Sequence, residues 1–231
     1  MSIAENIAQV RTNIAQACAQ AGRSPEEITL VGASKMNDAA ACREAIAAGI
    51  DALGENSVQE MTAKLADNAY DGAPLHFIGH LQRNKVKQVV GKVALIQSVG
   101  SMELLEEIEK VAAREQLVQD ILLEVNIGRE EAKSGFDPDA VTAAAEAALS
   151  LPHVRVRGLM TIPPADADRD ANMRYFQEVQ ALYVDINTKL FHNELKCLSM
   201  GMSGDYMDAI RCGATMVRVG TAIFGARNYN I

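Results

Sequence analysis

The sequence predicts an α/β protein of the (β/α)8 TIM-barrel class with an extra helix at its N-terminus. Eight short apolar runs alternate with segments of helical periodicity, the connections between them are short, and aromatic residues make up only 4% of the chain. Alternation of this kind indicates parallel strands joined by right-handed crossovers. An aliphatic, alanine-rich core suits helices packed on a parallel sheet better than an antiparallel sandwich.

The eight apolar runs are the expected strands, since each is bounded by turn residues or polar residues. They are residues 28–35, 51–55, 75–79, 93–99, 121–127, 154–160, 196–200 and 215–219. The expected helices occupy residues 3–21, 39–48, 57–66, 80–90, 101–114, 139–149, 169–191 and 205–212. No linker divides these elements, so residues 1–231 are predicted to form a single domain.

The first helix is predicted from apolar residues that recur on one face from Ile3 to Cys18, and Gly22 ends it. It precedes the first strand, so it packs against either the outer ring or the bottom of the barrel. Asp38, Ser101 and Asp205 stand where later helices need an N-cap.

The first strand, residues 28–35, is an almost continuous apolar run that leads into Lys35. In a parallel barrel, a side chain at the C-terminal end of a strand faces the ligand site. Apolar surroundings lower the pKa of a lysine, and its neutral amine can then attack a carbonyl. A doubly wound sheet is the rival fold, but it would need a G-x-G-x-x-G fingerprint where Met36-Asn37-Asp38 stands.

Charge and composition narrow the classes of partner. The net charge is −8, whereas a nucleic-acid surface needs clustered Lys and Arg. Four widely spaced cysteines indicate small buried side chains in a reducing compartment, and no His or Cys spacing suggests a metal site. No apolar run approaches the length of about 20 residues that a membrane span needs. We therefore expect a cytoplasmic protein without nucleic-acid or membrane partners.

Polar residues cluster at the predicted C-terminal ends of the strands. They are Lys35, Glu55, Asn56, His80, Ser98, Asn126, Ser199, Ser203 and Arg218. The loops at 200–205 and 220–222 each combine glycine, a hydroxyl and a helix start, which together can cradle an anion. A lysine facing a phosphate cradle suggests an aldehyde that carries a phosphate, such as pyridoxal 5′-phosphate (PLP). Arg218 is then placed to contact the ring nitrogen.

The sequence resembles the PLP homeostasis protein family and, more distantly, the barrel domain of alanine racemase. The similar segments are residues 33–35, 54–56, 76–85, 125–127, 133–135, 158–160, 198–205 and 217–225. The resemblance implies that Lys35 is the Schiff-base lysine and that Asn56 lies beside the cofactor. It assigns the phosphate to Ser203, Gly204, Gly220 and Thr221, and the ring nitrogen to Arg218.

One departure from the family pattern lies just after Lys35. Family members often have a second basic residue and a proline there, whereas this chain has Met36-Asn37-Asp38. Transfer of PLP between neighbouring lysines on this loop is therefore not expected. Lys133 is a weaker candidate for a second amine.

The resemblance implies a monomeric protein that holds and delivers PLP, with PLP-dependent apo-enzymes as candidate partners. No residue is assigned a catalytic role, because the sequence shows no second domain that could supply an acid/base group. The alternative is a PLP-dependent amino-acid racemase or decarboxylase. A Schiff-base aldolase on a similar barrel is a third reading, although its lysine usually lies on a later strand.

Overall fold

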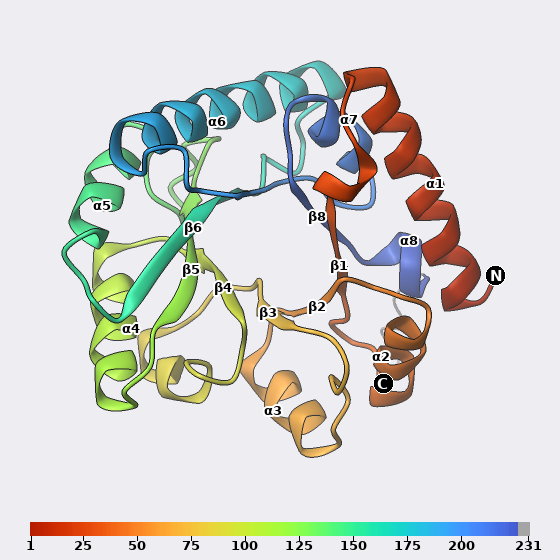
Figure 1. Cartoon of the computed structure of the whole chain (residues 1–231), viewed down its shortest axis with the longest axis horizontal. Helices are drawn as coiled ribbons and strands as arrows, with labels where there is room; N and C mark the ends of the chain where they lie inside the picture. The colour runs from red at the N-terminus through yellow and green to blue at the C-terminus, as the bar shows by residue number, and fades with distance from the viewer. Residues whose placement is uncertain (226–231) are drawn as a thin grey trace.

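A computed structural model describes residues 1–225 and shows a closed barrel of eight parallel strands in sequential order (Figure 1). Parallel pairing of β1 with both β2 and β8 closes the sheet. The (β/α)8 prediction is confirmed. The strands are β1 (Thr29–Ala33), β2 (Ala52–Glu55), β3 (Leu75–Phe77), β4 (Leu95–Val99), β5 (Gln119–Val125), β6 (Val154–Thr161), β7 (Cys197–Ser199) and β8 (Met216–Val219).

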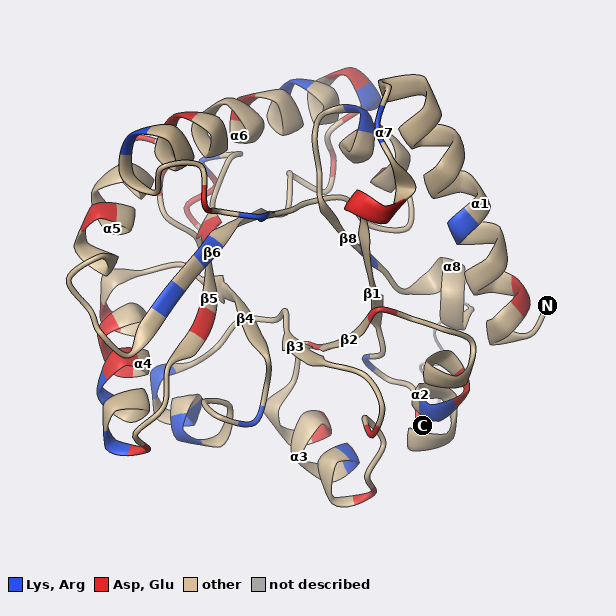
Figure 2. Cartoon of the chain, viewed as in Figure 1, with Lys and Arg blue, Asp and Glu red and all other residues tan. Residues whose placement is uncertain are grey.

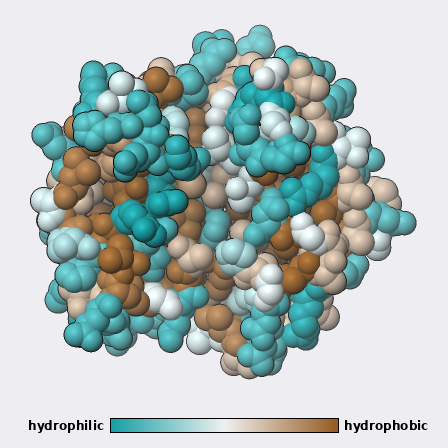
Figure 3. Space-filling view, viewed as in Figure 1, coloured by the Kyte–Doolittle hydropathy of each residue, from teal (hydrophilic) through white to brown (hydrophobic). Residues whose placement is uncertain are grey.

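Helices surround this barrel, and charged residues lie on them as well as on the strands and loops (Figure 2). They are α1 (Ile3–Ala21), α2 (Ala39–Ala47), α3 (Val58–Ala66), α4 (Met102–Arg114), α5 (Val141–Ala148), α6 (Arg169–Leu190), α7 (Tyr206–Arg211) and α8 (Thr221–Phe224), with 3-10 helices η1 (Pro25–Glu27) and η2 (Arg83–Gln88). The space-filling view shows hydrophilic and hydrophobic residues interspersed on one face (Figure 3).

The segment after β3 differs from the predicted helix over 80–90. It forms the short 3-10 helix η2, with i→i+3 bonds such as that from the N–H of Lys85 to the Gln82 carbonyl at 2.9 Å. Gln82 provides no side-chain cap, and tight 3-10 turns commonly serve as short connectors. The four-residue helix α8 was not predicted, because it is too short for a periodic pattern.

Helix α1 belongs to the outer ring, which settles the alternative left open by the sequence. Ser2 and Glu5 form a capping box at its start, and Gly22 ends it in the left-handed conformation at φ 66°. Its buried face packs against α2, α7 and α8, and the Asn6 amide donates to the Ile223 carbonyl at 2.8 Å. The helix therefore supports the segment that follows β8.

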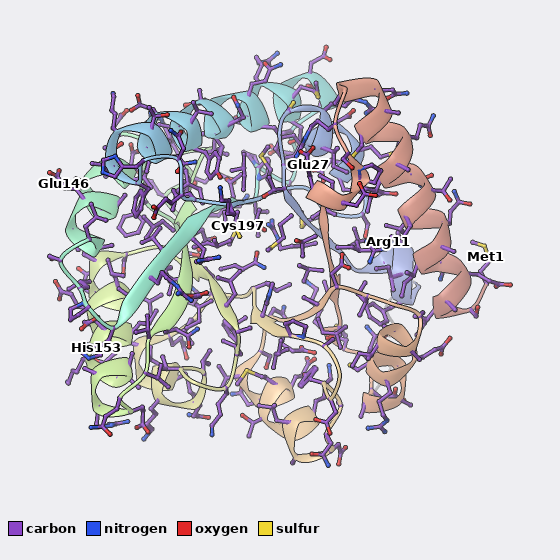
Figure 4. All side chains as sticks on the ribbon, in the orientation of Figure 1. Met1, Arg11, Glu27, Glu146, His153 and Cys197 are labelled. Carbon is purple, nitrogen blue, oxygen red and sulfur yellow. The ribbon has the colours of Figure 1, made fainter. Side chains whose placement is uncertain are left out.

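The core has two parts. One lies between the strands and the helices, and the other fills the barrel interior with Val31, Ala52, Leu95, Leu122, Met160 and Met216. All four cysteines are free thiols. Cys18 and Cys42 are buried as expected, but Cys197 and Cys212 are half-buried. Figure 4 shows Cys197 in the wall of the barrel, on β7, whereas His153 lies at the periphery. Within residues 1–225, no helix is long and apolar enough to cross a membrane.

Candidate functional site

A cavity of about 700 Å³ opens at the C-terminal end of the barrel. All seven residues that the sequence assigned to a cofactor line it, together with three further polar residues of the predicted rim or loops. These ten are Lys35, Asn56, Ser203, Gly204, Arg218, Gly220, Thr221, His80, Asn126 and Lys133. The volume falls within the range of about 300–1,000 Å³ that is typical of small-molecule sites.

Lys35 reaches this cavity from the turn after β1. The strand ends at Ala33, two residues earlier than predicted, and Lys35 is half-buried. Strand β1 pairs with β2 through Ala33 and Gly54 and with β8 through Gly32 and Val219. The first residues beyond these partner strands include Asn56 and Gly220, so the pairing brings both close to Lys35.

Asn56 is positioned by a close approach of the chain after β3. A Cβ atom at Gly79 would lie 2.3 Å from the Asn56 carbonyl oxygen, well inside van der Waals contact. Only glycine therefore fits at position 79 without moving Asn56. The N–H of Ile78 donates to the Glu55 carbonyl at 2.8 Å and extends the pairing of the two strands to this rim.

The loops after β7 and β8 are fastened to each other by Ser203. Its hydroxyl accepts hydrogen bonds from the N–H groups of Gly220 at 3.2 Å and Ala222 at 3.3 Å. The first helical bonds of α8 run from Ile223 and Phe224 to the Gly220 carbonyl. The N–H groups just before them therefore gather beside the Ser203 hydroxyl, as in an anion cradle.

Arg218 lies on β8 with its side chain inside the barrel. It is 3% exposed, and its guanidinium donates to the Ser199 hydroxyl at 2.5 Å and the Thr161 carbonyl at 2.8 Å. Burial lowers the pKa of Arg218 to about 10, so the group stays charged at neutral pH. Ser199 in turn donates to Gln97 at 2.7 Å, and the Gln97 amide contacts His76 Nδ1 at 3.0 Å.

Three residues expected at the rim do not line the cavity. Glu55 is fully buried outside the barrel against α3, because its side chain alternates with that of Asn56 along the strand. Ser98 donates to the Gly79 carbonyl at 2.5 Å. Ser199 lies below the cavity, where it holds Arg218.

Glu124 also lines the cavity, and it was not among the site residues predicted from the sequence. It is 9% exposed, its Oε2 atom has no hydrogen-bond partner, and burial raises the pKa of its carboxyl although the charge of Arg218 opposes the shift. The signal was available, because a glutamate within the apolar run 121–127 shares the barrel-facing side with Leu122.

Lys133 also lines the cavity, from the loop after β5. Its ammonium lies 2.5 Å from a Glu130 carboxylate oxygen and 3.5 Å from the Pro163 carbonyl. Lys133 is therefore a loop charge that pairs with Glu130 at the cavity.

Comparison with known proteins places the chain in a family. The model of the alanine racemase N-terminal domain matches residues 6–228. A "Pyridoxal phosphate homeostasis protein" of Aquifex aeolicus is 42% identical over 229 residues, covering 99% of this chain and 100% of the relative. The chain belongs to the pyridoxal phosphate homeostasis protein family. A relative of the same name from Escherichia coli K12 is 38% identical, with 99% of this chain and 98% of the relative covered.

Solved structures agree with this membership. A protein of Bifidobacterium adolescentis superposes with a TM-score of 0.90 at 36% identity, covering 96% of this chain and 94% of that one. PipY of Synechococcus elongatus, solved with PLP bound, gives a TM-score of 0.85 at 32% identity over 97% and 100% of the two chains.

The residues of this cavity fit the chemistry of PLP. One space is lined by a lysine amine, a buried guanidinium, and N–H and hydroxyl groups, which are the kinds of group that can contact an aldehyde, a ring nitrogen and a phosphate. At Gly204 an added Cβ would meet no atom within 4 Å, so the cradle is open at that point.

Proposed function

We propose that this chain binds PLP in the barrel cavity and serves intracellular PLP homeostasis, with PLP held as a Schiff base on Lys35. The observation that carries the proposal is the convergence of all seven sequence-assigned residues on one cavity. Family membership supports it, because the Aquifex aeolicus relative is named for PLP homeostasis and PipY was solved with PLP bound.

Each group has a separate task in this proposal. The Lys35 amine would hold the aldehyde carbon of PLP, with water as the molecule released. Ser203, Gly204, Gly220 and Thr221 bind the phosphate. PLP supplies an electrophilic carbon and an electron-withdrawing ring when it is bound.

Arg218 and Asn56 complete the site. The Arg218 guanidinium is held by Ser199 and the Thr161 carbonyl, and it would present its charge to the ring nitrogen of bound PLP. Asn56, just after the neighbouring strand β2, would contact the ring.

Residues 1–231 act as one PLP-binding domain, the protein works as a monomer in the cytoplasm, and PLP-dependent apo-enzymes receive the cofactor from it. The charge of −8 is consistent with a partner other than nucleic acid.

Absorption spectroscopy followed by borohydride reduction tests the proposal. The purified protein incubated with PLP should develop a visible absorption band, and reduction should fix the pyridoxyl group on the peptide that contains Lys35. Lys35→Ala should lose the band and keep the melting temperature within a few degrees. Lys133→Ala is the matched control, since it removes another amine at the same cavity. Labelling of Lys133 or Lys85 in the wild-type protein instead of Lys35 would overturn the assignment.

A further inference from the structure

A buried ion pair lies outside the barrel, between β2 and α3. Lys64 Nζ is 2.7 Å from Glu55 Oε1, and the two side chains are only 10% and 0% exposed. Glu55 Oε1 also accepts hydrogen bonds from the Ser34 hydroxyl at 2.5 Å and the Tyr70 hydroxyl at 3.1 Å. Side chains from β2, from α3, from the turn after β1 and from the loop after α3 therefore meet at one carboxylate oxygen.

This cluster is tied to the backbone on both sides of Lys35. The Lys64 ammonium donates to the carbonyl of Ser34 at 2.8 Å, one residue before Lys35. The Glu60 carboxylate accepts from the N–H of Met36 at 2.8 Å, one residue after it. Both anchors come from α3, where Glu60 and Lys64 are one turn apart and lie 3.5 Å from each other.

The backbone between the anchors has an unusual conformation. Met36 has φ 60°, in the left-handed region that residues with a Cβ rarely adopt. Such a conformation persists only where surrounding contacts hold it, and it is common where a chain presents a functional group. The bond from Met36 to Glu60 is a contact of this kind.

Stability alone does not explain the ion pair. Removing two charges from water costs about as much as their attraction returns, and apolar replacements of buried pairs are often neutral or stabilising. The polar contacts to Ser34 and Met36, in contrast, are ones that apolar side chains could not make. The cluster therefore helps to set the backbone geometry of the turn that carries Lys35.

We propose that Glu55, Glu60 and Lys64 are positioning residues that fix the backbone on both sides of Lys35 and so aim its amine into the cavity. The inference rests on the proposed function, in which this amine attacks the PLP aldehyde. A misplacement of about 1 Å at a reacting group can cost about 100-fold in rate.

Glu60 offers the sharper test, because its side chain is 34% exposed and α3 should tolerate its replacement. Glu60→Ala removes the acceptor for Met36, whereas Glu60→Gln keeps an oxygen at that place. The rate of PLP attachment to Lys35 is followed by borohydride trapping and peptide mass spectrometry. We expect Glu60→Ala to slow attachment by about tenfold and Glu60→Gln to restore most of the rate.

The double variant Glu55→Gln with Lys64→Met tests the buried pair without leaving one charge alone. It should slow attachment at least as much as Glu60→Ala. Asp185→Ala is the matched control, since Asp185 pairs with Lys189 across one turn of α6, on an exposed surface. Wild-type rates in both Glu60→Ala and the double variant would overturn the inference.

A readout without PLP separates this inference from the proposed function. Acetylation of Lys35 by acetic anhydride in the unloaded protein is measured relative to Lys85 in the same chain. A changed ratio in Glu60→Ala that Glu60→Gln reverses supports the positioning role even if PLP binds elsewhere. An unchanged ratio in Glu60→Ala counts against it. Failure of wild-type protein to attach PLP at Lys35 contradicts the proposed function alone.

Discussion

The hydroxyl of Ser203 accepts a hydrogen bond from the backbone N–H of Gly220 over 3.2 Å, and a second one from Ala222. This contact joins the loop after β7 to the loop after β8. It also places the hydroxyl beside the N–H groups at the start of α8, where Ser203 and Gly220 line the cavity. A phosphate placed there would receive donors from both loops at once.

The first prediction concerns this cradle. Ser203→Ala combined with Thr221→Ala should weaken PLP binding far more than binding of unphosphorylated pyridoxal. Each charge-assisted hydrogen bond contributes about 1.5–3 kcal/mol, so the loss of one lowers affinity by roughly 10- to 100-fold. Titration of both ligands by absorption spectroscopy measures the two losses.

Pyridoxal is the control within this experiment, because it has the aldehyde and the ring but no phosphate. Equal losses for the two ligands would show that the hydroxyls act by holding the loops together. The phosphate would then lie elsewhere in the cavity.

The second prediction concerns the support of Arg218. Ser199→Ala removes the acceptor 2.5 Å from its guanidinium and the donor to Gln97. A buried group left without its partner costs about 1–3 kcal/mol, so we expect a loss of about 2 kcal/mol in the free energy of unfolding. Urea denaturation measures it. Ser150→Ala is the control, since that exposed hydroxyl donates to the Ala147 carbonyl. Similar losses in the two variants would contradict the role of Ser199.

The sequence predicted the barrel well because alternation of strands and helices is a local pattern. Lys35, Arg218 and the two loops could be assigned because strand ends in a barrel converge on one rim. The direction of the Glu55 side chain could not be predicted, because successive side chains of a strand point to opposite faces. An error of one residue in the predicted end of the strand therefore moves a side chain from the cavity to the outer layer.

The contacts around the site could not be predicted from the sequence. The anchors from Lys64 to Ser34 and from Glu60 to Met36 join segments 30 and 24 residues apart. No periodicity or motif signals such a pair. Glu124 is a different case, because it stands inside an apolar run and only its two-residue spacing from Leu122 directs its side chain into the barrel.

The third prediction concerns pH and His76. Burial lowers the pKa of His76 to about 4 from its usual 6.5. Between these values the unfolded chain binds a proton that the folded chain does not, so stability falls as the pH decreases through this window. The loss between about pH 7 and about pH 4.5 should be roughly 2 kcal/mol from this group.

Comparison with His76→Gln isolates that contribution. The raised pKa of Glu124 changes stability in the opposite direction to His76, because a raised carboxyl pKa favours the folded state at lower pH. This effect is the same in the wild-type protein and in His76→Gln. Urea denaturation at the two pH values should show a smaller drop for the variant. Identical drops would mean that His76 accepts a proton in the folded barrel.

The last prediction is that the PLP-loaded protein turns over no amino acid at an enzymatic rate. With a pKa of about 10, Arg218 is charged at neutral pH. A fixed positive charge beside the ring nitrogen disfavours its protonation, and an unprotonated ring withdraws electrons less strongly. The racemase and decarboxylase alternatives both depend on that withdrawal.

The tyrosines of the described chain are also engaged elsewhere or lie outside the cavity. The hydroxyl of Tyr206 bonds to Asn13 of α1 at 2.9 Å, that of Tyr70 to Glu55 and that of Tyr183 to the Leu195 carbonyl. Among residues 1–225, no tyrosine lines the cavity, and Tyr229 lies outside the described residues. The described residues therefore offer no tyrosine as an acid/base group at this cavity, and such a group, when positioned, contributes about 10²–10⁴ in rate.

The test incubates the loaded protein with each common L-amino acid and follows α-proton exchange, chirality and carbon dioxide release. We expect every rate to stay far below one per second, which is about the lower end of typical enzymes. Arg218→Glu gives the matched comparison, because a carboxylate would favour a protonated ring nitrogen. Slow exchange that rises in this variant would support the electronic argument. Turnover near one per second in the wild-type protein would instead establish the racemase or decarboxylase alternative.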